Sequence, residues 1–427
     1  MKKVKNRVIA IVAAMVLIMI AAIPALAEDV NQPLSNGFSY ENVSGSKTME
    51  FTKYLIIEKD ANIPPDAVFD FTVTAGAPVA SSGTTYPVKA GITPEKVKVK
   101  LAGGTPTSGT AADSYAISFS GATPESTPTT DIDFNSGTQK YAKQTVVVDF
   151  SDVEFTKPGI YRYVITETNP AKFASVDSRV KTIDVYVTNE DTSGSGTTLI
   201  LEKYVMYDSA VSDAPASGTN PSDAEKTDKF INQYPSCNLK VTKRVSGNLA
   251  DKSEYFTFNI EISNAQNGTV YDLDLSNLVV NSGADINGAL TDKVTVENGK
   301  ANITVQLQHG QSITIYGIAE GSYYEVQEVR GQDGTSLDQE GYTTTISIPN
   351  NNSDLESGTT PTVSGRTITL SSGTGMIVQN EIVFTNTKDG KVPTGIDMKL
   401  VPIVMAAIVF MAGIAVLTVR MARKEEQ

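Results

Sequence analysis

The feature that most constrains this chain is the strand-like alternation of apolar and polar residues along its middle part. Segments such as "TIDVYVTN", "QTVVVDF", "NLKVTKRV" and "ANITVQLQ" alternate with a period of two. They are rich in β-branched residues and are separated by turn-forming residues. No segment between the two ends of the chain shows a long helical period. We therefore predict an all-β protein built from antiparallel β-sandwiches.

One ordered set of motifs occurs twice: T-K, F-x-F, Y-x-x-x-E and F-x-N. The first copy is longer, mainly between Phe71 and Glu167, where the excess is rich in Gly, Ser, Thr and Pro and is interpreted as loop insertion. The boundary between the copies falls near Pro235. We predict one domain over residues 28–235 and a second over residues 236–389.

Polar residues of this repeated set fall on the apolar face of their strands. With a period of two, Lys53 shares a face with Phe51 and Leu55, which is the wrong face for a solvated charge. Equivalent positions recur in both copies. The six polar residues predicted to face inward are Lys53, Glu167 and Asn232 in the first copy, and Lys243, Glu328 and Asn386 in the second.

Burial would change the chemistry of these groups. An unpaired buried charge is costly, so the group tends to become neutral. A neutral lysine is a nucleophile, and a protonated glutamic acid can transfer its proton. If the amine lies against the asparagine carboxamide, the products are an amide and ammonia. The alternative is a hydrogen-bonded Lys–Glu–Asn core without a covalent bond.

The N-terminus has the pattern of a secretory signal. Lys2, Lys3, Lys5 and Arg7 precede an apolar run from residue 8 to 23, and Ala25-Leu26-Ala27 follows as a cleavage site. We predict a signal peptide over residues 1–27. The alternative is an uncleaved membrane anchor.

The C-terminus has the pattern of a membrane anchor. Residues 400–419 are apolar and uncharged, which is long enough for a transmembrane helix. Arg420, Arg423 and Lys424 follow, and positive charge remains on the cytoplasmic side. The rest of the chain is therefore expected outside the cell. Because the chain ends in "RMARKEEQ", a lipid-anchor signal is disfavoured.

A short motif precedes this apolar run: Val392, Pro393, Thr394 and Gly395. It lacks a residue between Pro and Thr, yet it is similar to a V-P-T-G variant of the L-P-x-T-G cell-wall sorting signals of Gram-positive bacteria. Such signals are cut between Thr and Gly by a sortase. The resemblance implies a sorting signal over residues 390–427. The alternative is a plain membrane anchor with a chance Pro-Thr-Gly.

Taken over nearly its whole mature length, the chain resembles a Gram-positive pilus backbone subunit (a major pilin). Such subunits have tandem Ig-like (CnaB-like) domains with intramolecular Lys–Asn isopeptide bonds. The run "YVITETNP" is also similar to the E-box of these pilins. The resemblance implies that Lys53 is bonded to Asn232 with Glu167 as catalyst. It likewise implies that Lys243 is bonded to Asn386 with Glu328 as catalyst.

A pilus backbone also needs an amine that receives the Thr394 acyl group of another subunit. Some backbone pilins use the lysine of a Y-P-K-N motif, but the matching run here, "YPSCN", has no lysine. Another pilin type carries its linking lysine just before the last strand of the first domain, where this chain has Lys226 and Lys229. The resemblance favours Lys229; the alternative for both is a solvated surface lysine.

Several other functions are disfavoured. The net charge of −13 argues against nucleic-acid binding. Cys237 is the single cysteine, so no intrachain disulfide is expected, although an intermolecular one stays open. His309 is the single histidine, which leaves no hydrolase triad and no metal cluster. We expect no enzyme activity beyond autocatalytic isopeptide formation, and no cofactor.

The sequence leaves two functions open. The first is a sortase-polymerised pilus backbone subunit, exported, held at the membrane as a precursor and anchored to the cell wall after cleavage. The second is a monomeric wall-anchored adhesin or stalk protein of the same domain type. The expected partners are a sortase, other copies of the chain, minor pilins or peptidoglycan, and host surface ligands.

Overall fold

The structure is a computed structural model that describes residues 46–425, except 84, 104–115, 171, 190–198, 216–224, 279–289, 332–340, 349–352, 358–361, 367–378 and 391–400. Strands dominate it, so the predicted all-β class is confirmed. The predicted signal peptide, residues 1–27, and the sorting motif, residues 392–395, lie outside the described residues.

The first part of the chain folds into two sheets that face each other across one hydrophobic core. One sheet has the strand order β4 (Lys98–Leu101), β6 (Gln139–Asp149), β1 (Thr48–Glu58), β11 (Lys229–Tyr234) and β8 (Ala174–Ser175). The other has the order β10 (Leu199–Tyr207), β9 (Val180–Asn189), β7 (Gly159–Thr168), β2 (Val68–Ala75) and β5 (Ile117–Ser118), with β3 (Val88–Ala90) beside β7. A 3-10 helix, η2 (Pro94–Lys96), precedes β4.

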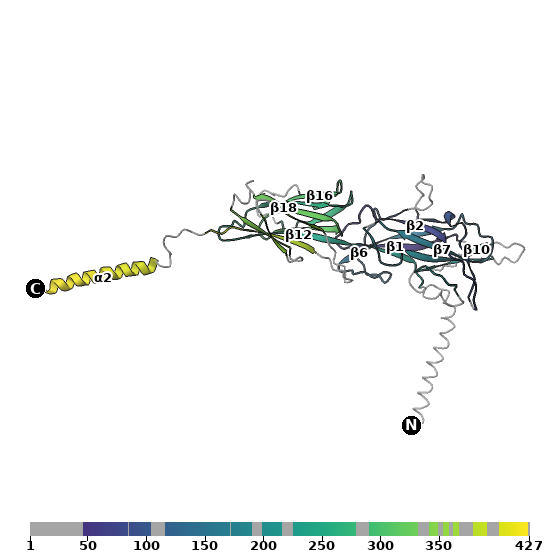
Figure 1. Ribbon diagram of the computed structural model, residues 1–427, viewed down its shortest axis with the longest axis horizontal. Helices are drawn as coiled ribbons and strands as arrows, with labels where there is room; N and C mark the ends of the chain where they lie inside the picture. The colour runs from purple at the N-terminus through teal and green to yellow at the C-terminus, as the bar shows by residue number, and fades with distance from the viewer. Residues whose placement is uncertain are drawn as a thin grey trace, which may run out of the picture.

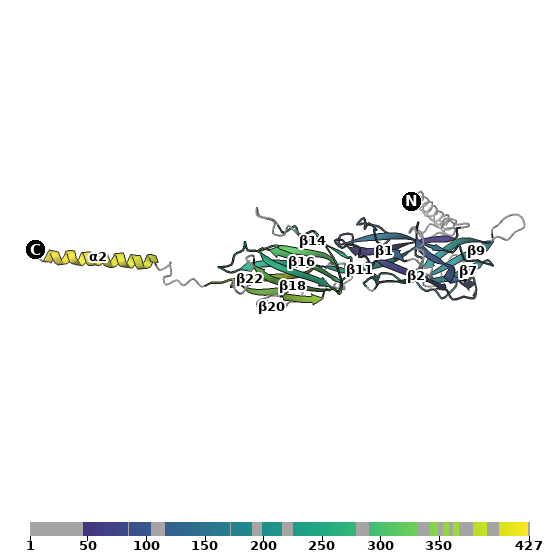
Figure 2. The same cartoon turned by 90° about the horizontal axis from the view of Figure 1, so that it is seen from above.

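The second part forms another pair of sheets around a second core. The larger sheet has the order β15 (Lys293–Thr295), β14 (Val270–Asp274), β17 (Ser312–Ala319), β12 (Ser236–Ser246), β22 (Gln379–Thr387), β19 (Thr343–Ile348) and β20 (Ser353–Ser357). The smaller has the order β16 (Lys300–Leu307), β13 (Phe256–Ser263), β18 (Tyr323–Gly331) and β21 (Thr362–Arg366). We call the two parts the first and second domains; they lie end to end (Figures 1 and 2).

In each domain the first strand pairs in parallel with the last. In the first domain β1 lies beside β11, with Lys53 opposite Phe230 and Leu55 opposite Asn232. In the second domain β12 lies beside β22, with Lys243 opposite Phe384 and Val245 opposite Asn386. Parallel neighbours need a long crossover connection, and here the rest of each domain supplies it.

Alternation along the strands separates the core from the surface. In β13 every second residue is buried, from Phe256 to Ile262, and the partner strand β16 alternates in the same way. Aromatic rings fill the first core: Phe51, Phe71 and Phe230 meet with ring centroids 5.1 to 5.4 Å apart. Such edge-on contacts add to the free energy of apolar burial.

The joint between the domains is short and closely packed. Only Pro235 separates β11 from β12. The Asn62 side chain of the first domain donates hydrogen bonds to the Val270 carbonyl oxygen at 3.1 Å and to the Asp272 carboxylate at 2.9 Å. Gly317 of β17 has a φ of +75°, and a Cβ added there would lie 2.8 Å from the Cα of Ala61.

The C-terminal helix α2 (Val401–Glu425) lies apart from both pairs of sheets (Figures 1 and 2). Within the described residues, no helix combines the length and the apolar character that a membrane crossing requires. The predicted transmembrane helix over residues 400–419 therefore stays a prediction.

A side chain at Gly317 should loosen the joint between the domains. Gly317→Ala should lower the free energy of unfolding of the second domain by about 1–2 kcal/mol through its left-handed backbone, and by about 1–3 kcal/mol more through the clash with Ala61. Denaturant unfolding followed by fluorescence measures the loss. The control is Gly310→Ala, because Gly310 also has a positive φ, +82°, but a Cβ added there would meet no atom within 4 Å. Equal losses in the two variants would contradict a packed joint.

Candidate functional site

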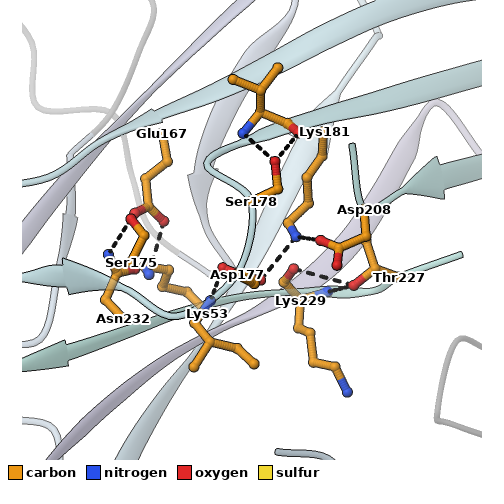
Figure 3. A network of polar contacts seen from close by, with 12 residues as sticks. Lys53, Glu167, Ser175, Asp177, Ser178, Lys181, Asp208, Thr227, Lys229 and Asn232 are labelled. Carbon is orange, nitrogen blue, oxygen red and sulfur yellow. Dashed lines mark hydrogen bonds and ion pairs between the residues drawn. The ribbon is translucent and has the colours of Figure 1, made fainter. Parts of the chain in front are cut away.

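The first domain brings its three predicted polar residues together in its core. Lys53 on β1 and Asn232 on β11 lie diagonally across the parallel strand pair and on the same face. Glu167 comes from β7 in the opposite sheet. The Lys53 ammonium lies 2.9 Å from the Glu167 carboxylate, and neither side chain is exposed by more than 1%. Figure 3 shows both pointing toward one another, with Asn232 beside them.

The second domain repeats this arrangement. The Lys243 ammonium lies 2.6 Å from Oε1 of Glu328, and both side chains are fully buried. The Asn386 amide nitrogen donates to the same carboxylate oxygen at 2.9 Å. The Asn386 carbonyl oxygen accepts a hydrogen bond from the hydroxyl of Thr344 at 2.8 Å. One carboxylate oxygen is thus within reach of both the amine and the amide nitrogen.

The F-x-F motifs build the walls of both sites. In each domain the second phenylalanine pairs with the glutamate in the strand register: Phe71 with Glu167 and Phe258 with Glu328. The first phenylalanine covers the amine. The Lys53 nitrogen lies 4.3 Å from the Phe69 ring centroid, and the Lys243 nitrogen lies 4.1 Å from the Phe256 ring centroid. The amines therefore lie among aromatic rings rather than in water.

Burial shifts the proton affinities in the direction that amide chemistry needs. Desolvation lowers the pKa of Lys53 to about 8, although the nearby Glu167 carboxylate acts to raise it. Desolvation likewise lowers the pKa of Lys243 to about 8, against the opposing effect of Glu328. Burial also raises the pKa of Glu328, while Lys243 opposes that rise. The state with a neutral amine and a protonated carboxyl group therefore costs less free energy here than it would in water.

Several polar atoms of these sites have no hydrogen-bond partner. In the first domain these are Nζ of Lys53, Oε2 of Glu167 and Oδ1 of Asn232; in the second, Oε2 of Glu328. Lys53 and Glu167 are close enough for an ion pair but lack the alignment of a hydrogen bond. Because buried polar groups are almost always paired, unpaired atoms on three groups of one site indicate a role other than stability.

A second buried cation lies next to the first site. Lys181 on β9 is fully buried and forms ion pairs with Asp177 at 2.9 Å and with Asp208 (Figure 3). Its nitrogen lies 4.7 Å from the Phe230 ring centroid. The sequence carried a signal for it, since Lys181 shares a strand face with Ile183 and Val185. The repeated motifs do not reveal Lys181, because the second copy has no matching lysine.

A buried ion pair on the other face of β7 was also missed by the sequence predictions. The guanidinium of Arg162 donates two hydrogen bonds to the Asp184 carboxylate, at 2.7 and 2.8 Å. It donates further bonds to the carbonyl oxygens of Val211 and Asp213. This pair fixes the segment after β10 onto the sheet, so its role is structural.

The remaining candidates lie away from these sites. Lys229 begins β11 and its amine donates to the carbonyl oxygen of Asp131. The backbone of Lys226 forms an isolated β-bridge with that of Tyr207. Burial lowers the pKa of the Lys226 amine. Cys237 is buried in the second core. The His309 ring accepts a hydrogen bond from the Val245 backbone at 2.9 Å. Across the described part of the chain, no three or more His, Cys, Asp or Glu side chains gather as a metal site.

Buried Lys243 should make the free energy of unfolding depend on pH in a variant that cannot form the predicted Lys243–Asn386 bond. In Asn386→Ala, we expect the free energy of unfolding of the second domain to rise between pH 8 and 10.5. Lys243 has a pKa of about 8 when folded, against 10.5 normally. The unfolded chain therefore binds more protons across this range, and stability increases with pH. The full rise is about 3 kcal/mol, measured by denaturant unfolding at several pH values.

The control for this experiment is Lys243→Met in the same Asn386→Ala background. Buried tyrosines such as Tyr271, whose pKa is raised by burial, act in the opposite direction near pH 10. They are present in both proteins, so the difference between the two profiles reports Lys243 together with the Glu328 carboxylate that it faces. Parallel profiles would contradict the lowered pKa.

Each of the two domains matches a family model. Residues 43–235 match the family described as the Spy0128-like isopeptide containing domain, FctA. Residues 237–388 match a domain of unknown function, DUF7601. A curated protein described as "Pilin" from Streptococcus pyogenes serotype M1 is 26% identical over 283 residues, which cover 63% of this chain and 70% of that pilin.

Solved structures of major pilins are also similar. The crystal structure of the major pilin from Streptococcus pyogenes matches with a TM-score of 0.46 and 19% identity, covering 81% of this chain and 99% of that one. The major pilin T-13 from the same species matches with a TM-score of 0.42 and 21% identity, covering 81% and 98%. Residues 43–235 therefore carry a Spy0128-like isopeptide containing domain of the FctA family, and the chain is similar to a streptococcal pilin.

Proposed function

We propose that this protein is a pilin, the backbone subunit of a sortase-polymerised pilus, and that an autocatalytic amide bond closes each of its two domains. The bonds join Lys53 to Asn232 and Lys243 to Asn386. One observation carries the proposal: two domains with different families and different lengths place a buried lysine, glutamate and asparagine in the same strand register. A core held only by hydrogen bonds would not require the same lysine, glutamate and asparagine in both domains.

The proposed reaction exchanges one amine for another on a carboxamide. The neutral Lys243 nitrogen attacks the Asn386 Cγ, a new carbon–nitrogen bond forms, and the bond to Nδ2 breaks. Glu328 accepts a proton from the attacking amine and delivers a proton to the departing nitrogen, which leaves as ammonia. The position of Oε1 between both nitrogens supports this role. In the first domain Glu167 acts on Lys53 and Asn232 in the same way.

Each bond joins the first strand of a domain to the last. Closing a loop of more than a hundred residues removes unfolded-chain entropy worth about 4–5 kcal/mol by the reasoning used for disulfides. The mechanical consequence is larger. Tension that enters at one terminal strand passes directly to the other, so the strands between them are not peeled apart. Because the bond is an amide, reductants do not open it.

We further propose that Thr394 is the acyl donor at which a sortase joins one subunit to the next or to the cell wall. Before cleavage, residues 400–419 would hold the precursor at the membrane. Large apolar side chains of α2 support this: Phe410 is 71% exposed and Val409 is 67% exposed. An apolar helix surface of this kind calls for a covering, and a bilayer supplies one. Partners in the assembled pilus would be other copies, minor pilins or peptidoglycan, and host surface ligands.

For the amine that accepts Thr394 we propose Lys229, with Lys226 as the second candidate. Both precede or begin β11 and lie at its N-terminal end. The Lys229 amine bonds only a backbone carbonyl oxygen among the described contacts, so little has to be broken to release it. Lys226 is more enclosed, and this burial lowers the pKa of its amine.

The mass of the folded protein tests the two amide bonds. We expect the exported fragment to weigh less than its sequence by two ammonia equivalents. Lys53→Ala and Lys243→Ala should each restore one equivalent, because each removes one nucleophile. Glu167→Gln and Glu328→Gln should do the same, because glutamine cannot exchange protons. Intact-mass spectrometry gives the count, and Lys181→Met is the matched control that should leave it unchanged. A wild-type mass equal to that of the sequence would refute the bonds.

Boiling in detergent tests polymerisation separately. In cells that carry the matching pilus sortase, wild-type chain should give a ladder of multimers on a denaturing gel. Lys229→Arg should reduce the ladder to monomer, because arginine keeps the charge but is not an acyl acceptor, whereas Lys226→Arg should keep the ladder. A single band from the wild type would instead favour the monomeric adhesin. Loss of the ladder only in Lys226→Arg would transfer the role to that lysine.

A further inference from the structure

We propose that the hydroxyl groups of Thr344 and Ser175 are catalytic residues of amide formation, each donating a hydrogen bond to the carbonyl oxygen of the reacting asparagine. This inference rests on the proposed Lys–Asn chemistry and adds a fourth group to each site. The repeated motifs of the sequence contain neither residue. They become visible only through the strand that borders the last strand of each domain.

In the second domain, Thr344 lies directly opposite Asn386 in the antiparallel pair of β19 and β22. Its side chain is buried, and its hydroxyl donates to the carbonyl oxygen of Asn386 at 2.8 Å. The amide nitrogen of the same side chain donates to Glu328. The carboxamide is therefore held at both ends, with its nitrogen toward the proton-transferring group and its oxygen toward a hydroxyl.

The first domain has a hydroxyl at the equivalent position. The short strand β8 borders β11 as β19 borders β22, and Ser175 lies directly opposite Asn232. The Ser175 oxygen is 3.4 Å from the Asn232 carboxamide (Figure 3). It already accepts a hydrogen bond from the Asn169 side chain at 2.8 Å, so its own hydrogen remains to be donated.

The Asn232 carboxamide can adopt the same orientation as that of Asn386. With its nitrogen toward Ser175, its carbonyl oxygen has no hydrogen-bond partner. A half-turn about the last side-chain bond exchanges the two ends at little cost in shape. The oxygen then accepts the Ser175 hydrogen, as the Asn386 oxygen accepts that of Thr344, and the nitrogen takes the place of the unpaired oxygen. This reproduces the arrangement around Asn386.

A donor at this oxygen assists the reaction where charge develops. When the lysine nitrogen attacks Cγ, the carbonyl oxygen gains negative charge in a buried core. A fixed hydroxyl stabilises that charge more than it stabilises the uncharged carboxamide. The hydroxyl neither gains nor loses a proton over the cycle, because Glu328 or Glu167 moves the protons and ammonia departs. The threonine and serine hydroxyls thus polarise the carbonyl group that the lysine attacks.

The rate of ammonia loss tests this role. Full-length chain is synthesised as a short pulse, and intact mass is followed over time together with the cross-linked peptide that contains Lys243 and Asn386. In Thr344→Val, which keeps the shape and removes the hydroxyl, bond formation in the second domain should be at least about tenfold slower; one such donor contributes about 10²–10³-fold in enzymes. The first domain should react at the wild-type rate.

Three further variants interpret the result. Thr344→Ser should restore the rate, because it restores the donor. Thr345→Val is the matched control, since Thr345 lies on the same strand with its side chain on the opposite face. Ser175→Ala should slow the first domain alone, and it decides the question if Thr344→Val fails to fold. A purely structural hydroxyl would lower the melting temperature without delaying ammonia loss from folded molecules.

The outcomes separate this inference from the proposed function. If wild-type protein never loses ammonia, the Lys–Asn bonds themselves are refuted. If wild-type protein forms both bonds and Thr344→Val and Ser175→Ala form them equally fast, only the role of the hydroxyl groups is overturned. Slower bond formation in the variants, with recovery in Thr344→Ser, supports it.

Discussion

The parallel pairing of the first and last strands is the contact on which the rest of each domain depends. It places Lys53 one diagonal step from Asn232, and Lys243 one diagonal step from Asn386. Parallel neighbours cannot be joined by a tight turn, so these strands meet only when the intervening chain has crossed the sandwich. The proposed reacting groups are therefore brought together by the folded sandwich and not by a local turn. An amide bond formed there would fix the fold that produced it.

The energetics of burial explain why a covalent bond suits this position. A buried Lys–Glu pair loses hydration that its mutual attraction barely offsets, so as an unreacted pair it adds little stability. Conversion of the amine to an amide removes the charge and its cost. Lys181, a short distance away, is buried too, but it meets the carboxylates of Asp177 and Asp208. Among the described residues no carboxamide contacts that amine, so Lys181 serves as an ion-pair partner.

The joint between the domains would transmit tension from one domain to the next in the proposed pilus. β11 continues into β12 with only Pro235 between them, and Asn62 ties the adjoining loop to the second domain. In the proposed pilus, force from a neighbour attached at Lys229 would run along β11 and β12 to Lys243. From there the proposed bond passes it to Asn386 and the C-terminal end. The joint is thus part of the path of tension, which gives a reason for its close packing.

The sequence by itself determined the class of fold and the inventory of inward-facing groups. A period of two decides which face of a strand a residue takes, and an ordered repeat shows which polar residues lie on the wrong face; the burial of Lys53, Glu167 and Asn232 follows from this. Only the tertiary structure decided which strands become neighbours and in which register, because pairing between strands more than a hundred residues apart leaves no local pattern. For that reason the hydroxyls of Ser175 and Thr344 could not be found from the sequence. Each is an ordinary strand residue until β8 or β19 is placed beside the last strand.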